Sequence, residues 1–330
     1  MNEQVGVSFD GFSTFDAAVA LAKEAVGAGA TGLWMADHLG YREAILSCLG
    51  FALAVPEVRV VPTAVSPYLR HPTPTAMQMA TLAEAAPGRA AIAVGVGNPL
   101  FLGESGETPD KPIRVVREFV EALRALWSGE PVTQEASRFR LKGARMMFRP
   151  SAPIPIYLAP TREQMLRLSG RIADGAVLSA GISTKYVQHS LSFVNEGAKA
   201  VERDPATLHT AAYIFVAASD DKKRAIDAVR HKLAFVLRNR ALDDNIAFTG
   251  IAVDQEAIIA AISKRDLDGA ARLVSDEAVD AFGIAGDVRT CCDKLQAFVD
   301  AGIKEPVLLL SGDAQDQRKS LDVIRALRAV

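Results

Sequence analysis

Asp37 and His38 are the adjacent residues that most directly suggest chemistry, because they follow an apolar run at Leu33 to Met35. A carboxylate beside an imidazole can fix the tautomer of the ring and hold its pKa near neutrality. The pair therefore predicts either acid/base catalysis, with His38 as a proton carrier oriented by Asp37, or a clamp on a cofactor. A purely structural interpretation is that Asp37 caps a loop or helix and His38 is packed.

A glycine pair follows another apolar run, at Gly95 and Gly97, with Asn98 directly after it. Glycines at this spacing allow the backbone to approach a flat ring or a phosphate closely. The sequence does not complete the dinucleotide-binding fingerprint GxGxxG, because Leu100 stands at the third glycine position. Taken alone, the motif favours a tight turn.

Polar residues also follow other apolar runs. Ser179-Ala180-Gly181 places small residues and their backbone N–H groups where barrels often bind phosphate. Arg70 could hold an anionic group, or it could belong to a solvated loop before the next helix. Ser8 and Asp10 lie at the end of the first apolar run.

Several other chemistries lack their characteristic residues. The five histidines show no HExxH or HxH spacing, so the sequence gives little support for a metal site. The three cysteines fit neither a disulfide framework nor a CxxC pair, and the sequence contains no phosphate-binding P-loop and no nucleophile elbow. A bound organic cofactor is therefore the simplest source of reactivity.

The elements that must position these residues alternate between short apolar runs and helical segments. Parallel strands need crossover helices, and closing the sheet removes its exposed edges, so the pattern predicts a (β/α)8 TIM barrel. A doubly wound open sheet is the alternative architecture. We expect one domain over 1–330, with a helical insertion at about 238–302 and an irregular excursion at 129–150. The expected strands are 5–9, 33–35, 58–61, 91–94, 154–158, 176–178, 209–216 and 307–310.

The composition narrows the possible partners. The chain has 330 residues, of which 49% are hydrophobic and 23% charged, and its 37 basic and 39 acidic residues give a net charge of −2. This balance provides no electrostatic case for binding nucleic acid or an anionic membrane. With few cysteines, no long apolar run and no basic leader at its start, the chain is expected to be a cytoplasmic protein that acts on a small molecule.

The collected motifs resemble the bacterial luciferase-like superfamily of flavin- and deazaflavin-dependent oxidoreductases. The resemblance is carried by Gly32-Leu-Trp-Met-Ala-Asp37-His38, by Pro67-Tyr-Leu-Arg-His71-Pro72 and by Val94-Gly-Val-Gly97. Later segments such as Ala281-Phe-Gly-Ile-Ala-Gly286 are similar to the methylenetetrahydromethanopterin reductases, which use the deazaflavin coenzyme F420. The resemblance extends over the whole chain.

This resemblance implies a barrel that binds a flavin or deazaflavin at the carboxyl ends of its strands. It implies a cis peptide bond between Thr63 and Ala64 that pushes on the ring. Asp37 and His38 would line the ring, and Ser66 would lie at its polar edge. The remaining cofactor-binding residues implied are Gly95, Gly97 and Asn98 beside the ring, and Ser179, Ala180 and Gly181 near the phosphate-bearing side chain.

The sequence departs from the reductases at two positions. The reductases carry acidic residues where this chain has Asn98 and Ser8. An amide or a hydroxyl can orient a substrate but does not deliver a proton as a carboxylic acid does. These differences weaken the case for a methylene-pterin substrate, although Asp10 could serve as a substitute acid.

The sequence is compatible with three functions. The first is hydride transfer between coenzyme F420 and a small organic substrate, with His38, Asp37 and Asn98 as catalytic residues and Ser8, Asp10 and Arg70 near the substrate. The second is a monooxygenase that uses O2 and reduced FMN supplied by a partner flavin reductase. The third is a flavin-binding protein without catalysis. The resemblance also implies a homodimer.

Overall fold

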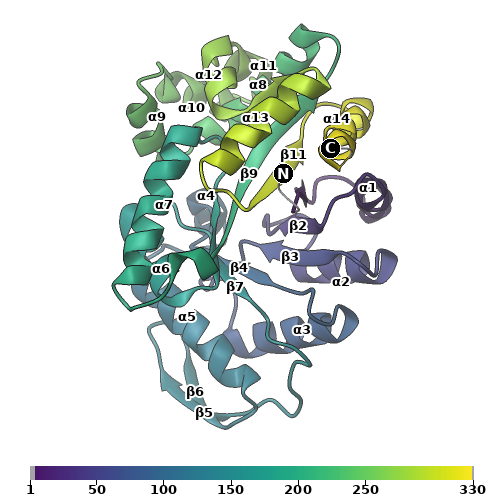
Figure 1. Cartoon of the computed structure of the whole chain (residues 1–330). Helices are drawn as coiled ribbons and strands as arrows, with labels where there is room; N and C mark the ends of the chain where they lie inside the picture. Colours follow the sequence, from purple (N-terminus) through teal and green to yellow (C-terminus); the bar gives the residue numbers. More distant parts are fainter. Residues whose placement is uncertain (1–3, 329–330) are drawn as a thin grey trace.

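Eight parallel strands form a barrel in the computed structural model, which describes residues 4–328 (Figure 1). Hydrogen bonds join the strands in the order β3-β2-β1-β11-β9-β8-β7-β4. Parallel bridges from Val60 to Ala90 and from Val65 to Val94 link β3 to β4 and close the ring. This closure confirms the predicted (β/α)8 barrel and excludes the open sheet. The strands are β1 (Gly6–Phe9), β2 (Gly32–Ala36), β3 (Arg59–Thr63), β4 (Ile92–Val94), β7 (Ile156–Leu158), β8 (Gly175–Leu178), β9 (His209–Ala218) and β11 (Glu305–Leu310).

A helix covers the barrel after each strand. In α5 (Pro112–Trp127), Val116, Val120 and Leu123 recur at helical spacing, and all three are buried. Most of the other helices begin at a residue whose side chain accepts a backbone hydrogen bond, as Thr14 does from the Ala17 N–H group at 3.3 Å. The covering helices are α1 (Phe15–Gly27), α2 (Ala44–Ala54), α3 (Pro72–Ala85), α5 (Pro112–Trp127), α6 (Glu163–Ile172), α7 (Thr184–Lys199), α8 (Lys222–Leu237) and α14 (Ala314–Arg328), with short η1 (Pro205–Thr207) before β9.

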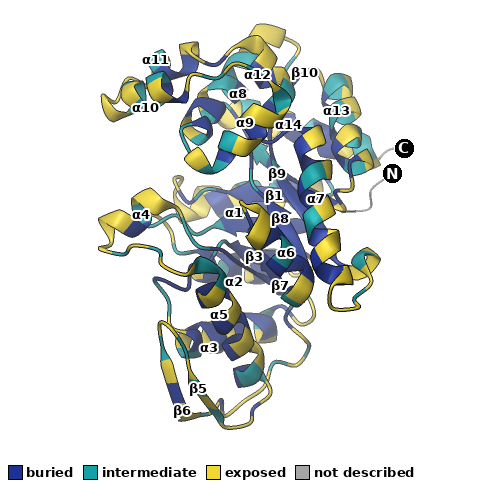
Figure 2. Cartoon of the chain, turned by 90° about the vertical axis from the view of Figure 1, so that its left-hand side faces the viewer, coloured by how far each residue is buried: buried dark blue, intermediate teal, exposed yellow. Residues whose placement is uncertain are grey.

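Two segments lie outside the barrel. The stretch 129–150, expected to be irregular, contains an antiparallel pair, β5 (Val132–Glu135) and β6 (Arg140–Ala144). These strands were missed because they are short and mostly polar. In Figure 2 this pair lies at the opposite end of the molecule from the helices α10, α11 and α12.

The segment between α8 and β11 is mainly helical. It also contains β10, a strand that sequence reasoning did not predict, which pairs in parallel with the end of β9. No helix within residues 4–328 is both long enough and apolar enough to cross a bilayer. The elements of the segment are η2 (Arg240–Leu242), α9 (Asp243–Thr249), α10 (Gln255–Ser263), α11 (Leu267–Arg272), α12 (Asp276–Phe282), β10 (Ile284–Gly286) and α13 (Val288–Asp300). Elsewhere in the chain, a short helix, α4 (Pro99–Glu104), lies between β4 and α5.

A buried carboxylate lies inside the amino-terminal end of the barrel. Glu305 is inaccessible to solvent, and its Oε1 accepts a hydrogen bond of 3.0 Å from Trp34 Nε1. Its Oε2 pairs with Arg59 and lies 2.8 Å from His209 Nε2. Tyr157 stacks on His209 with ring centroids 4.9 Å apart. The group therefore ties β2, β3, β9 and β11 together through side chains.

The ion pair and hydrogen bonds outweigh the burial of Glu305. Burial alone would raise the pKa of this carboxyl, but the hydrogen bond with His209 and the charge of Arg59 bring the pKa below its ordinary value of 4.5. An acid whose pKa is lower in the folded protein stabilises the fold above its unfolded-state pKa. Its contribution is lost as the pH falls through the folded-state pKa.

We predict that Glu305→Gln lowers the free energy of unfolding by about 3–5 kcal/mol near neutral pH, because Arg59 keeps its charge without its partner. Chemical denaturation measures this difference, which should shrink in acid, where Glu305 is protonated. Glu135→Gln is the matched control, since the Arg140–Glu135 pair is largely exposed and its loss should change stability by less than about 1 kcal/mol. Equal effects of the two substitutions would contradict the prediction.

Candidate active site

A cavity of about 250 Å³ opens at the carboxyl ends of the barrel strands. Its walls come from the segments that follow β2, β3, β4, β7 and β8, together with Tyr213 of β9. The structure brings the following predicted residues to its lining: Asp37, His38, Thr63, Ala64, Ser66, Gly97, Asn98 and Ser179. The other predicted residues, Ser8, Asp10, Arg70, Gly95, Ala180 and Gly181, are not part of the lining.

The backbone of Asp10, rather than Asp37, orients His38. His38 Nδ1 lies 2.9 Å from the carbonyl oxygen of Asp10. Because a carbonyl oxygen can only accept, Nδ1 carries the hydrogen, and Nε2 keeps a lone pair in the neutral ring. Phe12 stacks against His38 with ring centroids 5.4 Å apart, and Phe101 lies at 5.9 Å. The expected pairing of His38 with Asp37 was therefore wrong.

Asp37 is paired with a guanidinium instead. Arg70 Nη2 lies 3.0 Å from both carboxylate oxygens of Asp37, and it also donates a 2.7 Å bond to Glu43. Burial raises the pKa of Asp37, and the charge and hydrogen bonds of Arg70 oppose this rise. Arg70 was expected near a substrate, but its guanidinium is held by these two carboxylates. The ion pair fixes the loop after β2 against the loop after β3.

The peptide bond between Thr63 and Ala64 is cis, as the resemblance implied. Gly95 lies against this bond, since a Cβ added at Gly95 would come within 3.0 Å of Ala64 Cβ. Gly97 has φ of +101°, which an L side chain rarely adopts. Ser66 donates a 2.6 Å hydrogen bond to the carbonyl of Val96. Gly95 thus allows the segment after β4 to approach the segment after β3 closely, and Gly97 allows a left-handed turn.

Asn98 lies in the cavity wall and begins α4. Its Oδ1 accepts a 2.9 Å hydrogen bond from the Leu100 N–H group. The side-chain oxygen is therefore occupied as a helix cap, and the amide nitrogen is the group left to contact a bound molecule.

Two hydroxyl groups on the barrel interior have no protein partner. Tyr213 lines the cavity, and its buried Oη forms no hydrogen bond among residues 4–328. The same is true of Ser8 Oγ on β1 within the part of the chain that the structure describes. Burial raises the pKa of Tyr213, and the nearby hydroxyls of Thr63 and Ser8 only partly offset that rise. Buried polar groups normally have partners, so the hydroxyl of Tyr213, which lines the cavity, suits a ligand that supplies one.

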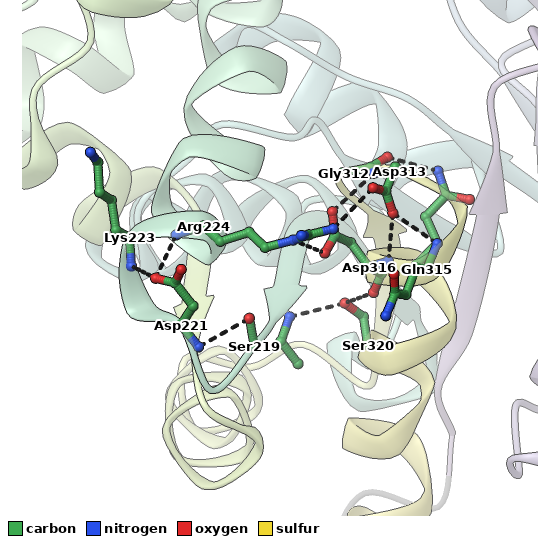
Figure 3. A network of polar contacts seen from close by, with 11 residues as sticks. Ser219, Asp221, Lys223, Arg224, Gly312, Asp313, Gln315, Asp316 and Ser320 are labelled. Carbon is green, nitrogen blue, oxygen red and sulfur yellow. Dashed lines mark hydrogen bonds and ion pairs between the residues drawn. The ribbon is translucent and has the colours of Figure 1, made fainter.

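A polar network joins the segments that follow β9 and β11 (Figure 3). Arg224 Nη2 lies 2.9 Å from Asp313 Oδ2, and its Nε lies 2.6 Å from Asp316 Oδ1. Ser320 Oγ accepts a 2.9 Å bond from the Ala218 N–H group. The charges of Arg224 and Asp313 thus hold α8 against the start of α14, and Asp313 lies in the loop between β11 and α14.

A second, larger depression of about 890 Å³ lies at the other end of the barrel, next to residues that precede β7 and β8. Its charged residues include Arg124 and Asp174, which pair with each other at 3.1 Å. Because barrel chemistry belongs to the carboxyl ends of the strands, we assign the site to the smaller cavity.

The sequence matches the luciferase-like monooxygenase family over residues 3–305. The chain belongs to this family. It is therefore an oxidoreductase of the luciferase-like type. The resemblance to this family that the sequence motifs indicated is confirmed.

Characterised relatives cover most of the chain. The 5,10-methylenetetrahydromethanopterin reductase of Archaeoglobus fulgidus is 27% identical over 299 residues, which is 88% of each chain. The F420-dependent glucose-6-phosphate dehydrogenase of Beutenbergia cavernae is 33% identical over 223 residues, covering 64% of this chain and 66% of that protein. The solved structure of the coenzyme F420 dependent tetrahydromethanopterin reductase from Methanopyrus kandleri superposes with a TM-score of 0.88, at 26% identity and 98% coverage of both chains.

Some lining residues of this luciferase-like site were not predicted. Pro160 and Thr161 follow β7, so the rule used for the other strands could have found them. Tyr213 lies in the middle of β9, and Asn239 lies beyond α8. Neither position follows an apolar run directly, so no sequence signal marked it.

Proposed function

We propose that this luciferase-like protein transfers a hydride between coenzyme F420 and a carbonyl or imine carbon of a small, uncharged substrate. The observation that carries the proposal is the cavity, where one imidazole nitrogen and one phenol hydroxyl are unpartnered within the described chain. Two relatives carry coenzyme F420 in their names, the glucose-6-phosphate dehydrogenase of Beutenbergia cavernae and the tetrahydromethanopterin reductase of Methanopyrus kandleri, and they support the choice of cofactor.

The residues present fit a flat, polar-edged ring. Ala64, Gly97 and Ser66 would lie along it, because they form the wall where β3 and β4 approach each other most closely. The unpartnered hydroxyl of Tyr213 would meet a ring heteroatom or the substrate. Ser179 would lie toward the phosphate-bearing side chain.

When bound, a deazaflavin supplies or accepts the hydride. His38 handles the accompanying proton, because its Nδ1 is fixed by the Asp10 carbonyl and its Nε2 is available. Reduction of a carbonyl adds one hydride to carbon and one proton to oxygen, and an imidazolium at Nε2 would provide that proton. In the reverse direction neutral Nε2 would accept the proton of the alcohol. Leu69, Phe101 and Leu102 contribute apolar side chains to the cavity lining.

The charges favour an uncharged substrate. Within the described residues, neither Lys nor Arg lines the cavity. Three nearby cations are engaged: Arg70 with Asp37, Lys232 with Asp10 at 3.3 Å, and Arg42 with backbone carbonyls. A sugar phosphate would find no free cation there. Asn98 and Ser8 replace the acids implied for a methylene-pterin substrate, so carbonyl and imine compounds are the better candidates.

Oxygen activation with reduced FMN is the second candidate, because the matching family is named for monooxygenases. The same His38 would then stand beside a flavin supplied by a separate reductase. The identity of the bound cofactor distinguishes hydride transfer from oxygen activation, because a reduced deazaflavin reacts poorly with O2.

We predict that the purified protein binds F420 at least about 100-fold more tightly than FMN, a difference of about 2.7 kcal/mol. Titration of each cofactor, oxidised and reduced, followed by ring absorbance or fluorescence measures this ratio. Tighter binding of reduced FMN, with oxygen consumption, would contradict hydride transfer and support the monooxygenase.

We predict that His38→Ala keeps the cofactor affinity within about tenfold and lowers turnover on the order of 100-fold or more, because only proton transfer is removed. Steady-state kinetics and the same titration measure the two effects. His231→Ala, at a half-exposed position on α8, is the control. Wild-type turnover in His38→Ala would exclude this role, and cofactor binding without any turnover dependent on His38 would indicate a non-catalytic flavin-binding protein.

We also propose that the protein forms a homodimer through α2. This helix reads AILSCLGFALA, and Leu46 and Leu53 on one face are 65% and 69% exposed. Phe15 of α1 lies directly over Gly50 of the same face. Exposed apolar side chains that share one helix face in this way are typical of a protein interface. A second copy of the chain is the partner that the family resemblance implies.

The double substitution Leu46→Lys with Leu53→Lys should produce a folded monomer, because it places charges in the proposed interface. Size-exclusion chromatography with light scattering gives the mass. Leu267→Lys, at a residue of α11 that is 58% exposed, is the matched control and should leave the dimer intact. A monomeric wild-type protein would contradict the proposal.

A further inference from the structure

The loop that joins β8 to α7 is short and buried. It comprises residues 179–183, and Ala180, Gly181, Ile182 and Ser183 are all buried. Ser179, its first residue, lines the cavity. Ser183 begins α7, and its Oγ accepts a 3.1 Å bond from the Tyr186 N–H group. The loop therefore connects the cavity wall to the start of a long helix.

One amide from the helical insertion holds this loop. Asn245 of α9 is completely buried. Its Oδ1 accepts a 3.1 Å hydrogen bond from the Ser183 N–H group, and its Nδ2 donates a 3.0 Å bond to the Gly181 carbonyl. A carboxamide supplies both an acceptor and a donor, so a single side chain satisfies both backbone groups.

The loop also packs against the end of α8. Gly181 has φ of +77°, and a Cβ there would come within 3.1 Å of Val236 Cγ1. Leu242 of η2 lies beside the same glycine. Asn239, between these two residues in the chain, lines the cavity. The insertion thus meets both the cavity and the loop over a few residues.

Asn245 leaves the other amides of the loop available. The N–H groups of Ala180, Gly181 and Ile182 find no acceptor in residues 4–328. Buried N–H groups normally have a partner, and consecutive free ones are typical of a phosphate cradle. The carbonyl of Gly181, which would repel an anion, is directed to Asn245 instead.

We propose that Asn245 is a positioning residue that holds the loop in the conformation needed to bind the phosphate of the cofactor. This inference rests on the proposed function, and it assigns to the insertion a part in cofactor affinity. Asn245 acts through the loop backbone and does not contact the reacting atoms.

The experiment compares ligands that share a ring and differ in phosphate. These are F420 against its deazaflavin chromophore without the phosphate-bearing tail, and FMN against riboflavin. Asn245→Asp keeps the acceptor for Ser183 but loses the donor to Gly181, and Asn245→Ala loses both. We expect either variant to weaken binding of the phosphate-bearing ligand about tenfold or more. Binding of the phosphate-free ligand should change less than about threefold.

Gln255→Ala is the matched control. Gln255 is a buried amide of the same insertion, and its Nε2 donates a 2.7 Å bond to the Leu237 carbonyl and a 3.4 Å bond to the Asn239 carbonyl, with no hydrogen bond to residues 179–183 among the described residues. An equal loss for ligands with and without phosphate, or an equally selective loss in Gln255→Ala, would overturn the role of Asn245. A wild-type protein that binds neither F420 nor FMN would overturn the proposed function itself. Thermal unfolding of each variant separates weakened binding from loss of the fold.

Discussion

The buried Glu305 is the interaction on which the geometry of the rest depends. Its carboxylate joins Trp34 of β2, Arg59 of β3 and His209 of β9 inside the amino-terminal end of the barrel. The same strands carry site residues farther along the chain, toward or beyond their carboxyl ends. β2 leads to His38, and β3 and β9 contribute Thr63 and Tyr213. A side-chain link that fixes these strands relative to one another also fixes the groups that meet in the cavity.

Charge compensation determines what the cavity can do. Among residues 4–328, Asp37 is the one carboxylate in the cavity lining, and Arg70, which is not part of the lining, pairs with it. What remains are hydroxyls, amides and one imidazole, groups that move or share a proton without adding a fixed charge. In a low-dielectric cavity, an uncompensated charge would strongly favour ligands of opposite sign. This charge balance agrees with the neutral substrate that we propose.

The sequence predicted the barrel and the residues that directly follow its strands, because apolar runs and their ends are local signals. His38, Asn98 and Ser179 were found in this way. The partners of these residues were not predicted. His38 is fixed by the backbone carbonyl of Asp10, 28 residues away. Every residue has a backbone carbonyl, so no residue type in the sequence indicates this contact. Tyr213 was missed because a strand interior looks the same whether its side chains face the core or a cavity. The β5–β6 pair was missed because short polar strands lack the apolar alternation.

The helical insertion contacts the loop after β8 through residues that are far apart in the sequence. Asn245 meets the β8 loop across 62 and 64 residues of sequence, so its importance follows only from the fold. A barrel of this type keeps its strands and changes its loops to change chemistry. Here a helix added outside the barrel supports a loop at the site, while Asn239 reaches the cavity from the same segment. Under the proposed role of Asn245, substitutions in that segment would alter cofactor binding while the eight strands and the position of His38 stay the same.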